Sequence, residues 1–140
     1  MLWALELAGL DDSRHLRIAD IGCGTGAASI ELASRLEAEI VSVDFLSPFL
    51  DELAQRARDV GVAESITTLE ASMEELPFED ASFDVLWSEG AVYNMGFAAG
   101  VESWRRFLRP GGVLVVSEIT WLTADRPAEI DDFWTGEYPE

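Results

Sequence analysis

Residues 18–26, with the sequence IADIGCGTG, decide the fold of this chain. An apolar run that contains Asp20 leads directly into three glycines at alternate positions, Gly22, Gly24 and Gly26. Glycine permits positive φ and lets the backbone approach a ligand closely, and the start of a following helix offers free N–H groups. The stretch therefore predicts a strand, a ligand-binding turn and a helix. The turn alone leaves open a dinucleotide, a phosphate or another adenosine-bearing ligand.

Strand and helix patterns alternate along most of the chain. They predict strands at residues 16–22, 39–45, 65–71, 83–88 and 113–118, and helices at residues 25–36, 47–61, 98–108 and 127–134. The second helix has Ser47 as its predicted N-cap, Pro48 in its first turn and Gly61 as its stop. Pro110-Gly111-Gly112 is a predicted turn between a helix and a strand. The alternation predicts βαβ units around a parallel sheet.

The composition is typical of one compact domain. The chain has 140 residues, of which 49% are hydrophobic, and no apolar run approaches the roughly 18–20 residues of a membrane span. We expect a single domain over residues 1–140, with a core at 16–118 and a short acidic tail at 119–140. The single Cys23 excludes an internal disulfide, and no spacing of cysteine and histidine predicts a metal site.

The charge argues against two classes of partner. The formal net charge is −18, and all nine basic residues are arginine. A surface of this sign repels nucleic acid and anionic membranes, so we expect neither as a partner. A cytoplasmic location is expected because no stretch has the pattern of a membrane span or of a signal peptide. Solubility with an arginine-rich genome, or a salt-adapted host, both account for the acidity.

Two carboxylates narrow the choice of ligand. Asp20 lies inside the predicted strand before the turn, where an ammonium-bearing ligand suits a carboxylate and a pyrophosphate does not. Asp44 ends the second predicted strand, placed to accept hydrogen bonds from ribose hydroxyls. The spacing Gly22-x-Gly24-x-x-Ala27 meets the dinucleotide pattern weakly, and a Walker A loop is excluded because the chain has no lysine.

With these features the chain resembles the class I S-adenosylmethionine-dependent methyltransferases. The motifs that carry the resemblance, in order, are DIGCGTG (20–26), VSVDF (41–45), ASMEELPF (71–78), SFDVLWSEG (82–90) and RFLRPGGVLVVSE (106–118). Within this class the set LPF, FD and LRPGG is similar to small-molecule methyltransferases of ubiquinone/menaquinone biosynthesis. The resemblance implies a Rossmann-like, doubly wound α/β fold with five parallel strands in the order 3-2-1-4-5.

The resemblance also implies S-adenosylmethionine as the cofactor and assigns residues to it. The three glycines would surround its methionine part, Asp20 would act on its ammonium group and Asp44 would bind its ribose. Phe45 would lie beside the adenine. Two of these roles have a structural alternative: Asp44 could be a surface or capping carboxylate, and Phe45 could be a core residue.

Further positions of the resemblance lie later in the chain. Ser72 would contact the adenine edge and Met73 would lie under the ring, with a core position as the alternative for Met73. Ser88 and Glu89, at the end of the fourth strand, would face the methionine end and the substrate.

The stretch WSEGAVYNMGF (87–97) follows the fourth predicted strand, at the carboxyl end of the sheet where open α/β folds bind ligands. Its candidate catalytic residues are Glu89, as a general base, and Tyr93, as a substrate contact. Trp87 and Asn94 are further candidate contacts with the substrate. The alternative for Tyr93 and Trp87 is that they only pack a lid.

Methyl transfer to a small-molecule acceptor is the expected function. The alternative is an inactive remnant that binds the cofactor and serves as an interaction module, and a third candidate is a nicotinamide-binding dehydrogenase domain. Family members usually continue with a C-terminal antiparallel strand pair, which is not visible here, so we expect a truncated domain. In such a domain the edge strand, 113–118, would be exposed. We therefore expect the acidic tail to cover it, or a second copy of the chain to pair with it in a homodimer.

Overall fold

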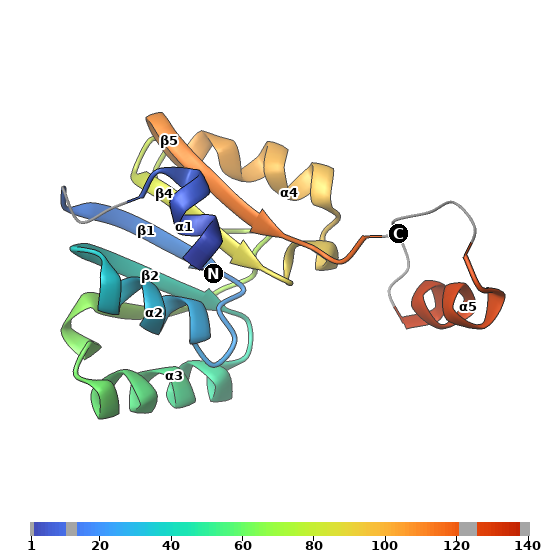
Figure 1. Ribbon diagram of the computed structural model, residues 1–140, viewed down its shortest axis with the longest axis horizontal. Helices are drawn as coiled ribbons and strands as arrows, with labels where there is room; N and C mark the ends of the chain where they lie inside the picture. The colour runs from blue at the N-terminus through green and yellow to red at the C-terminus, as the bar shows by residue number, and fades with distance from the viewer. Residues whose placement is uncertain (1, 11–13, 121–125, 138–140) are drawn as a thin grey trace.

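The computed structural model describes residues 2–10, 14–120 and 126–137, and its centre is one twisted parallel sheet (Figure 1). The strands are β1 (Leu16–Ile21), β2 (Ala38–Asp44), β3 (Ile66–Glu70), β4 (Phe83–Glu89) and β5 (Leu108–Ser117). They lie in the order β3-β2-β1-β4-β5, and every neighbouring pair is parallel. The Rossmann-like fold and the strand order are therefore confirmed.

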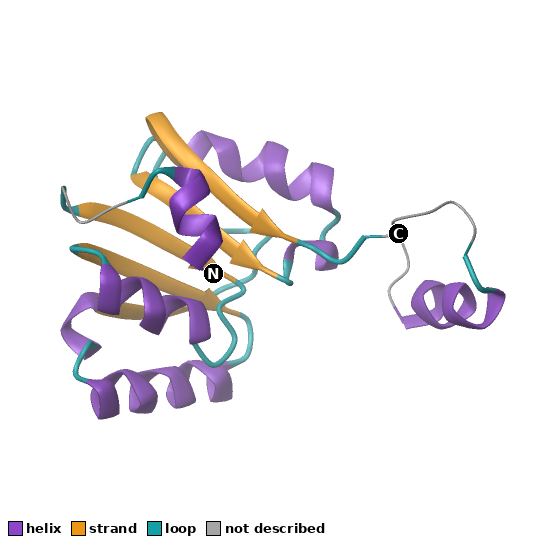
Figure 2. Cartoon of the chain, viewed as in Figure 1, coloured by secondary structure: helices purple, strands orange, loops and turns teal. Residues whose placement is uncertain are grey.

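Helices cover both faces of the sheet (Figure 2). The helices that cover these faces are α1 (Leu2–Ala8), α2 (Ala27–Arg35), α3 (Ser47–Val60) and α4 (Phe97–Trp104), and a further helix, α5 (Ala128–Glu137), follows β5 along the chain. On one face, Leu5 of α1 and Leu32 of α2 pack with Ile18 of β1 in one apolar cluster. On the other face, Trp104 of α4 packs in a second cluster with Ile21. Successive strand residues point to opposite faces, so helices on both faces bury nearly every residue of the central strands β1 and β4.

The start of α3 and the end of α4 differ from the sequence prediction in their local structure. Ser47 is the first residue of α3 and not its N-cap, because Leu46 takes the cap position without a side-chain hydrogen bond. The predicted stop is confirmed, since Gly61 ends α3 with a φ of 80°. The predicted helix at 98–108 is α-helical only to Trp104, and a short 3-10 helix, Arg105–Phe107, completes it.

The predicted turn at Pro110-Gly111-Gly112 lies inside β5 and does not precede it. Leu108 pairs with Phe83 and Val113 pairs with Val85, so β5 advances five residues, from 108 to 113, where β4 advances two, from 83 to 85. The extra residues form an irregularity in the ladder. An edge strand tolerates proline at such a point because the pairing needs no backbone N–H there, and proline has none to donate.

β5 forms one edge of the sheet, and α1 contacts it from the other end of the chain. The helix of the acidic tail, α5, lies apart from the sheet (Figure 1) and leaves this edge uncovered. Within residues 2–10, 14–120 and 126–137 there is no strand beyond β5. None of the described helices has the length and apolar character needed to span a membrane.

Candidate cofactor site

The glycine loop connects β1 to α2 and lies across the end of β2. Its three glycines all adopt positive φ, at 75° for Gly22, 53° for Gly24 and 81° for Gly26. The backbone N–H groups of Gly22 and Cys23 both donate to the carbonyl of Val43, at 2.8 and 2.9 Å. These two hydrogen bonds hold the loop against the strand that carries the second motif.

Asp44 connects this loop to β2 through its side chain. One carboxylate oxygen accepts a hydrogen bond from the backbone N–H of Gly24 at 2.8 Å, and the other accepts one from the N–H of Leu46 at 2.9 Å. A carboxylate has about four acceptor positions, so about two remain. Asp44 therefore fixes the loop and still offers acceptors to a ligand hydroxyl.

A cavity of about 640 Å³ opens at the carboxyl ends of the strands, which is where open α/β sheets bind ligands. The loops that follow β1, β2, β3 and β4 all contribute to its wall. The predicted site residues that line it are Gly22, Gly24, Asp44, Phe45, Ser72, Met73 and Tyr93. Segments far apart in the sequence thus meet around one cavity of a size suited to a small molecule.

The other predicted residues are Asp20, Gly26, Ser88 and Glu89, and they do not line this cavity. Gly26 is the N-cap of α2, and a Cβ at this position would overlap the side chain of Leu53. Ser88 is fully buried, and its hydroxyl donates to the carbonyl of Ile21 at 2.8 Å. Gly26 and Ser88 therefore have structural roles that need no ligand.

Asp20 is a buried carboxyl just before the glycine loop. It is 1% exposed and accepts a hydrogen bond of 2.6 Å from the hydroxyl of Ser29. Burial raises the pKa of Asp20 to about 7; the hydrogen bond from Ser29 opposes this rise, and the charges of Glu89 and Asp44 add to it. The charges of Glu89 and Asp44 thus create a negative potential at Asp20 beside the loop, which favours a cationic ligand.

Sequence reasoning missed part of the apolar rim of the cavity. Leu46 and Phe49 line it together with Phe45, and the three side chains are 47, 40 and 72% exposed, respectively. The available signal was the run of large apolar residues after a strand end, since exposed apolar groups cluster at binding sites. Asn94 lines the cavity as proposed. Trp87 is not a substrate contact, because it is fully buried in the core.

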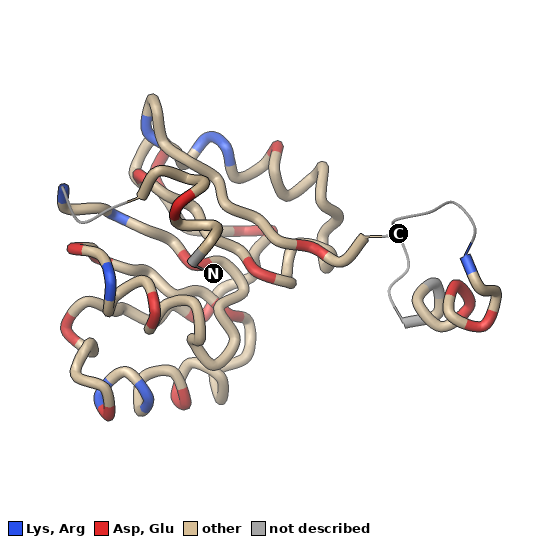
Figure 3. The backbone as a smooth tube through the Cα atoms, in the orientation of Figure 1, with Lys and Arg blue, Asp and Glu red and all other residues tan. Residues whose placement is uncertain are grey.

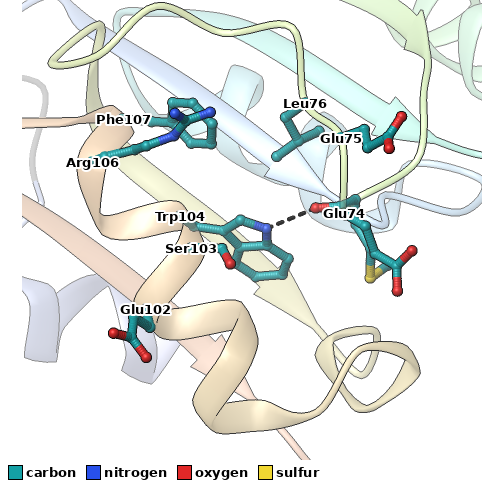
Figure 4. A pocket seen from close by; sticks show the side chains of 9 residues that line it. Glu74, Glu75, Leu76, Glu102, Ser103, Trp104, Arg106 and Phe107 are labelled. Carbon is teal, nitrogen blue, oxygen red and sulfur yellow. Dashed lines mark hydrogen bonds between the residues drawn. The ribbon is translucent and has the colours of Figure 1, made fainter.

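A second cavity, of about 470 Å³, is lined by residues 73–76 and by Trp104 of α4, among others (Figure 4). The indole N–H of Trp104 donates to the backbone carbonyl of Met73 at 2.9 Å. Met73 and Glu74 line both cavities. Trp104 is 1% exposed and is therefore fixed in the core. Its hydrogen bond thus holds the loop that carries Ser72 and Met73, two predicted contacts of the cofactor.

Comparison with known proteins agrees with this geometry. The model of a family described as a methyltransferase domain matches residues 18–112. The chain is 34% identical over 128 residues to tocopherol O-methyltransferase of Arabidopsis thaliana, and the aligned region covers 84% of this chain and 35% of that protein. It is 30% identical over 137 residues to a ubiquinone/menaquinone biosynthesis C-methyltransferase of Proteus mirabilis, and the aligned region covers 95% of this chain and 53% of that protein.

A solved structure shows the same fold at low sequence identity. Phosphoethanolamine N-methyltransferase 2 of Haemonchus contortus, in complex with S-adenosyl-L-methionine, has a TM-score of 0.85 and 22% identity, covering 98% of this chain and 32% of that one. The chain spans about half or less of the length of the two curated relatives. The matched family region contains the glycine loop, Asp44 and all of β4. The chain belongs to the class I S-adenosylmethionine-dependent methyltransferases.

Proposed function

We propose that this chain binds S-adenosylmethionine in the cavity at the glycine loop and serves methyl transfer to a small-molecule acceptor. The observation that carries the proposal is the carboxylate of Asp44, which holds Gly24 and lines the cavity at the same time. Family membership supports the reaction, because the curated relatives are named as methyltransferases.

The cavity fits an adenosyl ligand that carries a positive charge. Asp44 has acceptor positions for ribose hydroxyls, and the exposed ring of Phe45 offers a stacking surface to a flat base. At Gly24 a Cβ would meet no atom within 4 Å, so the backbone leaves room for a ligand to approach. The carboxyls of Asp20, Asp44 and Glu89 suit sulfonium and ammonium groups.

The remaining predicted residues fall into two groups. We assign Gly22 to the methionine part of the cofactor, and Ser72 and Met73 to the adenine, since all three line the cavity. Gly26 and Ser88 support the site indirectly, through the packing of α2 and the hydrogen bond between β4 and β1.

The cofactor, when bound, supplies an electrophilic methyl group on sulfur, so the protein mainly has to align the acceptor and exclude water. Tyr93 lines the cavity from the short 3-10 helix Val92–Asn94, and its backbone N–H donates to the carboxylate of Glu118 at 2.9 Å. We assign Tyr93 to positioning of the acceptor. Glu89, at the end of β4, directly precedes Gly90 of the cavity wall but does not itself line the cavity, so removal of a proton from the attacking atom by Glu89 stays a prediction.

The acceptor and the partners stay predictions. Relatives are named for methyl transfer to oxygen and to carbon, so family membership leaves the acceptor atom open. Acidic residues are spread over the fold while basic residues are few (Figure 3), which supports the expectation that nucleic acid is not a partner. A cytoplasmic location and a homodimer through the β5 edge also remain predictions.

A calorimetric titration with S-adenosylhomocysteine and, separately, NADH tests the proposal, together with transfer of labelled methyl from S-adenosylmethionine to a panel of phenols, amines and quinols. Binding of the homocysteine derivative with methyl transfer is the expected result. Binding without transfer to any acceptor would favour the inactive interaction module. Tight saturable binding of NADH alone would favour the dehydrogenase domain. Family membership favours methyl transfer over both alternatives.

A further inference from the structure

Three polar side chains form a continuous line through the buried layer between β1, α2 and β2. The hydroxyl of Ser29 in α2 lies 2.6 Å from Oδ2 of Asp20 and 2.7 Å from the hydroxyl of Ser42. Both serines are fully buried. Ser42 lies opposite Asp20 in the strand register, on the same strand as Asp44. The line therefore connects the strand before the glycine loop with the strand that ends at the loop.

The two hydroxyls can satisfy Asp20 in either protonation state. When Asp20 is ionised, Ser29 donates its single hydrogen to the carboxylate, and Ser42 donates to Ser29. When Asp20 is protonated, it donates to Ser29, whose own hydrogen then goes to Ser42. The hydrogen bonds of the two hydroxyls thus reverse direction when Asp20 gains or loses its proton. Ser29 stabilises the ionised form more than the protonated form, because its O–H donates to the charged carboxylate itself. Ser42 stabilises the protonated form more, because it then accepts the hydrogen of Ser29, whereas in the ionised form Ser29 keeps its hydrogen bond to Asp20 without Ser42.

The titratable groups around Asp20 come from three other parts of the fold. Glu89 at the end of β4 and Asp44 at the end of β2 both oppose its ionisation by their charge. Cys23 in the loop is a buried thiol, and burial and then the charges of Asp20 and Asp44 raise the pKa of Cys23. These groups disfavour any further negative charge beside the loop.

The arginines on the neighbouring helices are engaged in other interactions. Arg35 of α2 forms an ion pair with Glu31 on the exposed side of the helix. Arg56 of α3 donates to the carbonyl and the hydroxyl of Thr25, at 2.7 and 2.9 Å. A ligand cation is therefore well suited to supply the charge that favours ionisation of Asp20.

We propose that Ser29 and Ser42 are positioning residues that couple the binding of a cationic ligand at the glycine loop to loss of the proton of Asp20. The inference rests on the proposed function, because the cation is the ammonium or sulfonium group of the cofactor. Since the serines stabilise opposite protonation states, replacing each by alanine shifts the ionisation of Asp20 in opposite directions. A merely space-filling role for the two serines predicts no such opposition.

The first test needs no ligand. Carbon-13 NMR follows the carboxyl of Asp20 through a pH titration in the wild type, Ser29→Ala and Ser42→Ala, with Asp20→Asn to assign the signal. Loss of the hydrogen bond from Ser29 is expected to raise the midpoint by about one pH unit, and loss of the acceptor at Ser42 to lower it by up to about one unit. Ser34→Ala is the control, because this exposed hydroxyl of α2 donates to the carbonyl of Ile30.

The second test measures the affinity for S-adenosylhomocysteine and S-adenosylmethionine between about pH 5.5 and 9.5, so that the range extends beyond the raised midpoint expected for Ser29→Ala. Each variant is compared with its own limit at high pH. At about pH 6.5, the loss of affinity relative to that limit is expected to be roughly tenfold larger for Ser29→Ala than for the wild type. For Ser42→Ala the loss is expected to be two- to threefold smaller than for the wild type. Midpoints that move in the same direction, or that match Ser34→Ala, would overturn the inference.

Two further outcomes separate the inference from the proposed function. A folded wild type that binds both ligands with an affinity independent of pH contradicts the coupling and leaves cofactor binding in place. A folded wild type that binds neither ligand contradicts the proposed function and the coupling together.

Discussion

The side-chain carboxylate of Asp44 accepts a hydrogen bond of 2.8 Å from the backbone N–H of Gly24. This bond connects the end of β2 with the middle of the glycine loop, two segments that the sequence separates by a helix. It sets the position of the loop before a ligand is bound, which lowers the ordering cost of binding. The same side chain lines the cavity, so loop geometry and ligand recognition depend on one residue.

Two glycines of the loop are expected to respond differently to alanine. At Gly26 a Cβ would overlap the side chain of Leu53 at a φ of 81°, so Gly26→Ala should lower the free energy of unfolding by about 2–4 kcal/mol. At Gly24 a Cβ meets nothing within 4 Å, so Gly24→Ala should fold and bind S-adenosylhomocysteine at least tenfold more weakly. Urea unfolding and calorimetry distinguish the two effects. Normal binding by folded Gly24→Ala would contradict the assignment of the loop.

Phe45 is expected to matter for binding and not for folding. Its side chain is 72% exposed, so Phe45→Ala should change the free energy of unfolding by no more than about 0.5 kcal/mol. Loss of a stacking surface should weaken S-adenosylhomocysteine binding by about 1 kcal/mol, or roughly fivefold. Phe97→Ala is the matched control, because Phe97 is 54% exposed and does not line the cavity. Equal affinities of the two variants would remove Phe45 from the site.

Asp84 is expected to stabilise the fold at the end of the sheet away from the cavity. Burial acts to raise the pKa of Asp84, but hydrogen bonds from the N–H of Arg17 at 2.9 Å and from Arg109 at 2.7 Å outweigh it, so the pKa is lowered. A lowered pKa in the folded state gives a stabilisation that is present above the unfolded pKa and is lost as the pH falls.

The variant Asp84→Asn tests this stabilisation. It should lower the free energy of unfolding by about 1–3 kcal/mol near pH 7 and by less near pH 3, with cofactor affinity unchanged. Urea titrations at both pH values provide the measurement. A loss of stability that is the same at both would show that the charge of Asp84 is not its cause.

The pKa shift of Asp20 has the opposite sign to that of Asp84. The pKa of Asp20 in the fold, about 7, lies above its ordinary value of 3.8, so the folded chain retains a proton that the unfolded chain releases. The stabilisation is complete below about pH 4 and is lost as the pH rises through about 7. Asp20→Asn should therefore raise the free energy of unfolding of the ligand-free chain near pH 8 by about 2–4 kcal/mol. Urea unfolding near pH 5 and 8 checks this, and a variant that is less stable near pH 8 would contradict it.

Local patterns predicted the features that depend on neighbouring residues. The glycine loop, the strand that ends in Asp44 and the stop at Gly61 each have a signal within a few positions, and the structure has all three. Pro110 was interpreted as a turn because proline ends helices, yet it also suits an irregular edge strand, and only the pairing with β4 distinguishes the two.

Contacts between distant residues could not be predicted in the same way. The hydrogen bond from Trp104 to Met73 joins residues 31 apart, and the contact between Ser29 and Ser42 needs the packing of α2 on β2. Trp87 follows three successive residues, Asp84, Val85 and Leu86, that show no clear alternation of apolar and polar side chains, so its sequence position does not show whether it faces the core or a ligand.

The affinity of the wild type and of Asp44→Asn for S-adenosylhomocysteine, measured by calorimetry near pH 7.5, tests the central claim most directly. Asp59→Asn serves as the control, because Asp59 is an exposed residue of α3 outside the cavity. The account predicts micromolar binding by the wild type and by Asp59→Asn, and binding weaker by about 1–3 kcal/mol in folded Asp44→Asn. Equal affinities of the wild type and Asp44→Asn would contradict the claim that Asp44 forms the cofactor site.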